Sequence, residues 1–264
     1  MSDEETERYI QHVIDRKENS LNLSYRSLRA VPNLVGNCTF LENLYLNNNE
    51  LIIPPDEQLN NLTTLETLSL EHNQLTMLPN SLWNLKSLVR LNLSDNPLSY
   101  IPSELGQLIN LHELWLTNMN LYDLPTNLFV NLVQLEKLSL KSNHLRHLTT
   151  NIGYLSELRW LSVEDNELDD LPDSLQDCSK LSYLNLNSNH FVRVPSVIGR
   201  ISTLDVVCLQ RNAIADVDDD TLLMFSQMNK VDLRENPLVE RPGHWKVKRK
   251  FSLFKSKFSR FFRV

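Results

Sequence analysis

Short stretches of alternating apolar and polar-facing residues recur along this chain at a nearly constant distance. Leu44 and Leu46 stand on either side of Tyr45, and Leu68 and Leu70 stand on either side of Ser69. Such alternation predicts a short β-strand with one buried face. Phrases of this kind open at Leu41, Leu65, Leu88, Leu111, Leu135, Leu158, Leu181, Leu204 and Met228, and a looser copy surrounds Leu21. We therefore expect ten repeats of 23 or 24 residues whose strands pair with their equivalents in the adjacent repeats.

An asparagine closes the strand in most repeats, at the ninth position of the phrase. Its amide can donate to and accept from backbone groups that a turn leaves unpaired, so we interpret this residue as structural. A Leu-Pro or Val-Pro step and two further apolar residues follow, which suit an irregular or short helical segment. Two repeats depart from the pattern: Met119 replaces the asparagine, and Thr149 replaces the proline. The asparagines are Asn49, Asn73, Asn96, Asn143, Asn166, Asn189, Asn212 and Asn236.

The phrase L-x-x-L-x-L-x-x-N-x-L at this period resembles the leucine-rich repeat. The resemblance implies an α/β fold, a horseshoe-shaped leucine-rich-repeat solenoid of about ten repeats with a parallel concave sheet and helical caps. The proline-containing segments are similar to those of intracellular proteins of the Ras-suppressor, Shoc and Erbin/Scribble type. That second resemblance implies a scaffold with contacts to small GTPases or phosphatases.

The repeats divide the chain into three parts. Residues 18–240 are predicted to form the solenoid, and its two apolar ends require caps. Residues 1–17 are predicted to form an N-terminal capping helix, in which Ser2 and Glu5 make a capping box. One face of that helix carries Tyr9, Ile10, Val13 and Ile14. Residues 241–264 form a separate C-terminal cap or tail.

Side chains at the third, fifth and seventh positions of each phrase face outward on the concave side and are free to vary. Most are small, polar or charged, but four are aromatic, and aromatic residues dominate interface energetics. An exposed tryptophan without a role is costly, so we predict a binding site for a protein partner, in which Trp115, Trp160 and Tyr183 lie within about 10–20 Å of one another. The alternative is that aromatic residues occupy these positions by chance. The predicted site comprises Tyr45, Glu113, Trp115, Lys137, Lys141, Arg159, Trp160, Glu164 and Tyr183.

Charge separates the tail from the solenoid. The tail takes nine of the chain's 26 basic residues and no acidic residue, which leaves 17 basic and 33 acidic residues in residues 1–240, a net charge of −16. On a helix, Val247, Phe251, Phe254, Phe258 and Phe261 would form one apolar stripe. A basic amphipathic segment of this kind is typical of membrane-surface and calmodulin-binding sequences. The candidate residues are Lys246, Lys248, Arg249, Lys250, Phe251, Phe254, Lys255, Lys257, Phe258, Arg260, Phe261 and Arg263.

The interleaved lysines, phenylalanines and serines also resemble the effector segment of the myristoylated alanine-rich C-kinase substrate. That resemblance implies an anchor to anionic lipid, released by calmodulin or by phosphorylation of Ser252, Ser256 and Ser259. Two structural alternatives remain open. In the first, Trp245 and its neighbours serve solely as a cap on the last repeat. In the second, the cationic tail folds back on the acidic body.

Composition indicates a cytoplasmic protein, either free or peripheral at the inner face of a membrane. The three cysteines, Cys38, Cys178 and Cys208, fall inside repeats and are odd in number, unlike the flanking clusters of secreted relatives. The acidic first residues fit neither a secretory signal nor a mitochondrial presequence. The apolar stretches are far shorter than a membrane span.

The sequence gives little support for a catalytic function. The five glycines form no phosphate-binding loop, and no His/Cys cluster has metal-ligand spacing. Cys208 has no adjacent histidine, and we interpret it as a free surface thiol. We therefore predict a non-enzymatic, monomeric adaptor without a cofactor or metal, and the alternative is a pure scaffold whose tail is only a cap. Nucleic-acid association through the tail is a second alternative, which the acidic body disfavours.

Overall fold

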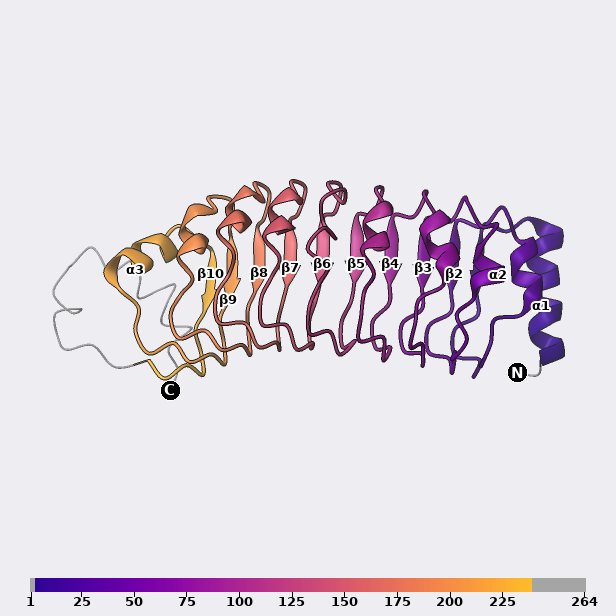
Figure 1. Cartoon of the computed structure of the whole chain (residues 1–264), viewed down its shortest axis with the longest axis horizontal. Helices are drawn as coiled ribbons and strands as arrows, with labels where there is room; N and C mark the ends of the chain where they lie inside the picture. Colours follow the sequence, from indigo (N-terminus) through magenta and orange to yellow (C-terminus); the bar gives the residue numbers. More distant parts are fainter. Residues whose placement is uncertain (1–2, 239–264) are drawn as a thin grey trace.

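The ten predicted strands form one continuous parallel sheet in sequence order (Figure 1). The computed structural model describes residues 3–238. Leu44 pairs with Leu68 and Leu68 with Leu91, so that equivalent positions stack in rows across neighbouring repeats. The fold is therefore the predicted solenoid. Its strands are β1 (Ser20–Asn22), β2 (Asn43–Tyr45), β3 (Thr67–Ser69), β4 (Arg90–Asn92), β5 (Glu113–Trp115), β6 (Lys137–Ser139), β7 (Trp160–Ser162), β8 (Tyr183–Asn185), β9 (Val206–Cys208) and β10 (Lys230–Asp232).

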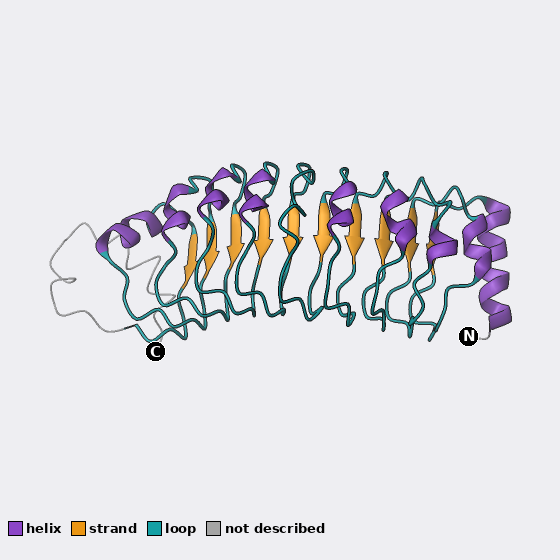
Figure 2. Ribbon diagram, viewed as in Figure 1, coloured by secondary structure: helices purple, strands orange, loops and turns teal. Residues whose placement is uncertain are grey.

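Short helices follow the strands in most repeats and run along one side of the solenoid (Figure 2). Five of the six 3-10 helices begin after a proline, whose fixed φ suits the first turn of a helix. The helices are η1 (Asn33–Asn37), α2 (Asp56–Leu59), η2 (Asn80–Asn84), η3 (Ser103–Gln107), η4 (Thr150–Tyr154), η5 (Asp173–Asp177), η6 (Ser196–Arg200) and α3 (Asp219–Phe225).

The core is a stack of leucines that runs through all ten repeats. The central strand residues Leu44, Leu68, Leu91 and Leu114 have no exposed surface. Burial of each such side chain contributes on the order of 1.5–3 kcal/mol. Because each leucine packs against those of adjacent repeats, a repeat is stable only within the stack.

The asparagines form the predicted ladder. Asn73 Nδ2 donates to the carbonyls of Leu46 at 3.0 Å and Leu70 at 2.8 Å, and its Oδ1 accepts from Leu51 N at 3.1 Å. Each asparagine thereby links its own repeat to the preceding one, and equivalent bonds recur from Asn49 to Asn236. The structural interpretation of these residues is confirmed.

Met119 interrupts the ladder, and its neighbours compensate for the loss. Its side chain is fully buried. The carbonyl of Leu116 accepts a hydrogen bond from Asn143 Nδ2 at 2.8 Å. The N–H of Leu98 donates to the carbonyl of Asn96, also at 2.8 Å. A side chain that cannot form the ladder bonds is therefore tolerated at this position.

Thr149 stands where other repeats have a proline, and it adopts the same backbone conformation. Its φ of −61° and ψ of 141° match those of Pro79, which are −67° and 136°. The Thr149 hydroxyl accepts from Asn151 N at 3.3 Å and donates to the carbonyl of Thr126 at 3.1 Å. The threonine thus contributes a helix cap that proline lacks.

Helix α1 (Asp3–Arg16) lies at the N-terminal end of the solenoid, where the sequence predicts a capping helix (Figure 1). Ile10 and Val13 are fully buried, and Tyr9 and Ile14 pack partly buried against the same core. Ser2 lies outside the described residues, so the capping box stays a prediction. The tail beyond residue 238 lies outside them as well, and every prediction made for it remains one.

Candidate concave binding site

Three of the predicted aromatic residues form one cluster on the sheet. We call Trp115, Trp160 and Tyr183 the aromatic cluster. The ring centroids of Trp115 and Trp160 are 5.4 Å apart with an interplanar angle of 46°. The rings of Trp160 and Tyr183 stack with centroids 5.5 Å apart at 9°. Both separations fall in the range of favourable aromatic pairs and lie within the limit that we predicted.

The small side chain of Ser139 explains why the two tryptophans meet across an intervening strand. Trp115 ends β5 and Trp160 begins β7, so two strand spacings, about 10 Å, separate their backbones. On β6 between them, Ser139 is in register with Trp115 and is only 3% exposed. Its short side chain leaves room for both indole rings above the strand.

Contact within the cluster corrects one expectation. All three aromatic residues have intermediate exposure, and none is the fully exposed side chain that the repeat position suggests. Each ring covers part of its neighbour, which lowers the cost of displaying it. The remaining surface of the rings is open to the concave side.

Cys208 adjoins this cluster but is not the surface thiol that we predicted. The side chain is only 6% exposed, and its sulfur lies 4.0 Å from the hydroxyl of Tyr183. Burial raises the pKa of the Cys208 thiol, and burial also raises the pKa of Tyr183 to about 12. Both groups are therefore uncharged near neutral pH.

The charged residues around the cluster pair with one another or with neighbouring residues. Lys137 Nζ lies 3.0 Å from Glu113, Lys141 Nζ lies 3.3 Å from Glu164, and Arg159 Nε lies 3.8 Å from Glu136. The predicted mixed-charge rim is present, and its charges largely neutralise each other. The net charge beside the cluster is therefore small.

Tyr45 does not join the aromatic cluster. It lies on β2, three strands away from β5, and lines a shallow depression of about 560 Å³ between the sheet and α1. Arg26 Cζ stands 4.9 Å from the centroid of the Tyr9 ring there. Sequence reasoning missed this second surface because Tyr9 comes from the capping helix and Tyr25 from the eighth position of its repeat. The lining residues are Tyr9, Asn22, Ser24, Tyr25, Arg26, Tyr45 and Asn47.

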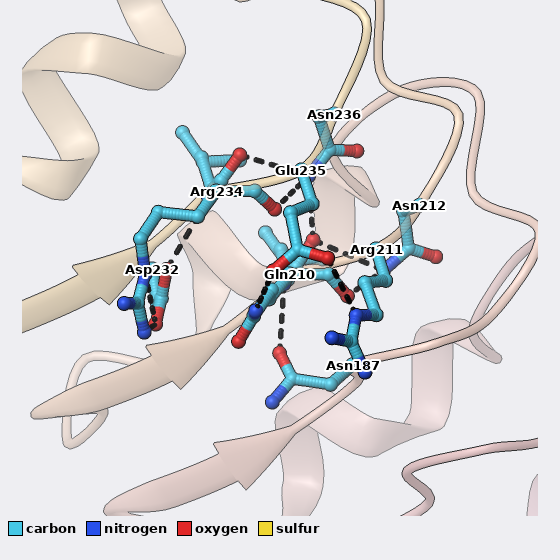
Figure 3. Close-up of polar contacts among 10 residues, drawn as sticks. Asn187, Gln210, Arg211, Asn212, Asp232, Arg234, Glu235 and Asn236 are labelled. Atoms are coloured by element: carbon cyan, nitrogen blue, oxygen red, sulfur yellow. Dashed lines mark hydrogen bonds and ion pairs between the residues drawn. The ribbon is translucent and has the colours of Figure 1, made fainter. Parts of the chain in front are cut away.

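A network of paired charges ends the concave face at β10 (Figure 3). The Glu235 carboxylate accepts from Arg211 Nε at 2.6 Å and also from Gln210, and these bonds lower its pKa. Asp232 accepts from Arg234 Nη2 at 2.6 Å and from Arg234 Nε at 2.9 Å. This pairing lowers the pKa of Asp232. Both carboxylates therefore remain ionised at pH values well below neutral.

Glu71, His72 and Asp95 form a small polar group near the middle of the sheet. One potential ligand atom from each residue lies within 4.8 Å of the others. The remaining carboxylate oxygens accept from Asn92 Nδ2 and Asn118 Nδ2, both at 2.7 Å. The imidazole lies at the surface and 3.5 Å from each carboxylate.

Comparisons with known proteins agree with the fold. Residues 39–98 match the leucine-rich repeat family. A leucine-rich-repeat protein of Leptospira interrogans has a similar structure, with a TM-score of 0.67 and 28% sequence identity over 88% of this chain and 71% of that one. The curated proteins give no significant match. Among the described residues, no helix combines the length and apolarity that crossing a membrane requires.

Proposed function

We propose that this leucine-rich-repeat solenoid is a non-enzymatic adaptor that binds a protein partner on its concave face. The observation that carries the proposal is the contact of Trp115, Trp160 and Tyr183, which come from three different strands. Leucine-rich-repeat solenoids commonly present extended concave surfaces to other proteins. The similarity of the repeats to the Ras-suppressor class supports a cytoplasmic signalling role with small GTPases or phosphatases.

The physical case for a contact centre is the amount of rigid apolar surface that the cluster offers. Trp and Tyr contribute large contact areas and lose little side-chain entropy when they are already packed. The stacked rings of Trp160 and Tyr183 are held by each other before a partner arrives. Ion pairs such as Lys137 with Glu113 surround them and would exclude water at the rim without contributing much affinity.

Replacement of Trp160 tests this proposal. We expect Trp160→Ala to weaken binding of the partner captured from lysate by about 2 kcal/mol or more, because the residue contacts both other rings. The melting temperature should change little, since the ring lies outside the leucine core. Affinity would be measured by titration against the isolated partner.

Tyr154→Ala is the matched control, because Tyr154 is an exposed aromatic residue that ends η4 on the other side of the repeat. This variant should bind like the wild type. If a Trp115→Ala, Trp160→Ala double variant retains full affinity, the aromatic cluster is not the contact centre. The pure-scaffold alternative would then be favoured.

The tail supports a second proposed activity, reversible attachment to an anionic membrane. Nine basic residues without an acidic residue, together with the phenylalanine stripe, support it. Each Lys or Arg near an anionic bilayer contributes about 1 kcal/mol, and each inserted ring adds a comparable amount. Binding to calmodulin rests on the same residues and is an outcome that the test distinguishes.

Co-sedimentation with phosphatidylserine liposomes tests membrane binding. The full chain should sediment at low salt, and removal of residues 246–264 should abolish sedimentation. Glutamate at Ser252, Ser256 and Ser259 would lower the tail charge from +9 to +6 and should release much of the protein, as should added salt. If neither the wild type nor the triple variant binds, the tail does not act as an anchor. Competition by calcium-loaded calmodulin separates the two ligands.

A further inference from the structure

Three potential metal ligands converge just beyond the ends of β3 and β4. They are the carboxylates of Glu71 and Asp95 and the imidazole of His72, and we call them the ligand group. One ligand atom from each residue lies within 4.8 Å of the others, and these three residues are the one such set that residues 3–238 contain. Imidazole nitrogen and carboxylate oxygen are both common ligands of divalent transition metals.

The repeat determines where the ligand group stands. His72 and Asp95 occupy the same position in adjacent repeats, three residues after the ends of β3 and β4. Both have a left-handed backbone, with φ of 52° and 56°. Because adjacent strands lie about 4.8 Å apart, side chains in this row are within reach of one another. Glu71 directly precedes His72, so one turn and its neighbour supply all three ligands.

Amide groups of the following repeats hold the two carboxylates in place. Glu71 Oε2 accepts from Asn92 Nδ2 at 2.7 Å. Asp95 Oδ1 accepts from Asn118 Nδ2, also at 2.7 Å. The other oxygen of each carboxylate, Oε1 or Oδ2, is the one that lies 3.5 Å from His72 Nε2. Metal-bound carboxylates are usually oriented by hydrogen bonds of this kind.

The spacing of the ligand atoms suits a tetrahedral metal ion. Zn²⁺ binds these atoms at about 2.0–2.2 Å, so two ligands of one tetrahedral ion stand about 3.3–3.6 Å apart. The two 3.5 Å distances from His72 Nε2 fall in that range, whereas both are long for a hydrogen bond. Rotation of the partly exposed Glu71 and Asp95 side chains can shorten the third distance, which is at most 4.8 Å.

Charge also favours a cation at this point. Other carboxylates on the concave face have a lysine beside them, as Glu113 has Lys137 at 3.0 Å and Glu164 has Lys141 at 3.3 Å. Within the described part of the chain, Glu71 and Asp95 form ion pairs with His72 but with no lysine or arginine. Two neighbouring carboxylates repel each other, and a divalent ion between them removes that repulsion.

We propose that Glu71, His72 and Asp95 bind one divalent transition-metal ion, represented by Zn²⁺, through His72 Nε2 and one oxygen of each carboxylate. The imidazole ligand favours Zn²⁺ over Mg²⁺ and Ca²⁺, which prefer oxygen ligands. Three protein ligands leave a fourth position for water, and the His72 side chain is 51% exposed, so that position is open to solvent. This site does not depend on the proposed partner binding.

Calorimetric titration of the full chain with Zn²⁺, without an affinity tag and near neutral pH, tests the proposal. We expect one ion per chain. Asn118→Ala removes the hydrogen bond that holds Asp95 and should weaken the affinity about tenfold, whereas His72→Asn and Asp95→Asn remove ligands and should each weaken it about 100-fold or more. Thermal unfolding without metal checks that each variant is folded.

Asp165→Asn is the matched control. Asp165 is an acidic residue in the same row, three residues after β7 ends, but the neighbouring repeats place Ser142 and Ser188 beside it instead of a histidine. This variant should bind Zn²⁺ like the wild type. A wild type that binds no Zn²⁺ up to about 100 µM overturns the proposal, as does unchanged affinity in both His72→Asn and Asp95→Asn.

Cobalt absorption tests the geometry of the bound ion. Co²⁺ accepts the same ligands as Zn²⁺, and a tetrahedral Co²⁺ ion absorbs visible light far more strongly than the hydrated ion. The wild type should develop these bands, and added Zn²⁺ should remove them. His144→Asn should keep the bands, although His144 also lies 3.5 Å from a carboxylate, that of Glu167. Bands that persist in His72→Asn but vanish in His144→Asn would assign the metal to the wrong histidine for this proposal and refute it.

Discussion

Asn143 follows the repeat in which Met119 replaces the ladder asparagine, and it pairs with the backbone of that repeat. Its Oδ1 accepts from the N–H groups of Met119 and Leu121, at 3.0 and 3.1 Å. Its Nδ2 donates to the carbonyls of Leu116 and Leu140, at 2.8 and 2.9 Å. A single amide therefore satisfies four buried backbone groups from two repeats.

We expect Asn143→Ala to lower the free energy of unfolding by about 1–3 kcal/mol, because it leaves buried polar groups unpaired. Met119→Asn should leave that free energy unchanged or raise it, since an amide at this position can form the ladder bonds that the other repeats have. Urea denaturation of both variants measures the difference. Equal losses at the two positions would contradict the ladder argument.

Thr149 shows that backbone conformation matters more than residue type at the start of a 3-10 helix. Thr149→Pro should retain wild-type stability, because φ is already −61° and the loss of the hydroxyl cap is offset by a stiffer unfolded chain. Thr149→Gly should cost about 1–2 kcal/mol, because it removes the cap and adds freedom to the unfolded chain. Thermal unfolding compares the two, and equal stability of the glycine and proline variants would refute this explanation.

At the scale of elements, β10 depends on an ion pair that compensates a nearly buried carboxylate. Asp232 occupies the row that holds Ser69, Ser139 and Ser162 in other repeats, and its carboxylate is only 5% exposed. The Arg234 guanidinium compensates for that burial and holds the pKa of Asp232 below its usual range. The last repeat is thus the one whose strand carries a nearly buried charge.

This pair predicts a pH dependence confined to the C-terminal end. Because the pKa of Asp232 is lower in the folded state, its contribution is fully present above about pH 4, the unfolded value, and is lost as pH falls through the folded pKa. Hydrogen exchange of residues 228–236 should therefore accelerate at acidic pH relative to the central repeats. Arg234→Gln should raise the Asp232 pKa measured by NMR, whereas Arg90→Gln should leave it unchanged. An unaltered Asp232 pKa in the first variant would disprove the pairing.

At the scale of the whole molecule, stability is transmitted only between neighbouring repeats. Every strand pairs with its sequence neighbours alone, so opening from an end breaks one interface at a time. We expect hydrogen-exchange protection to be greatest in β4–β7 and to fall toward both ends.

Ile10→Asp should lower protection in β1 and β2 more than in β6, because Ile10 is fully buried where α1 covers the first repeat. A substitution on the exposed face of the same helix, Gln11→Ala, is the control. Uniform loss of protection along the whole chain after Ile10→Asp would show that the solenoid opens as one unit.

Much of this architecture follows from the sequence because the order of the strands in the sheet is the order of the repeats along the chain. The period specified the number of strands, their order and their parallel register, since each leucine phrase has only its neighbouring phrases to pack against. The role of Asn73 and its equivalents was also predictable from the hydrogen-bonding capacity of an amide at a turn. The helix at Asp3–Arg16 follows from its apolar stripe.

Side-chain contacts between rows were decided only by the tertiary structure. The repeat predicts that Trp115, Trp160 and Tyr183 share a face, but the short Ser139 between the strands lets the rings meet. The burial of Cys208 beside Tyr183 was likewise not predictable from its repeat position. Repeat position specifies where a Cβ points, whereas the direction in which a long side chain leans depends on the volume of neighbours that are more than twenty residues away in sequence.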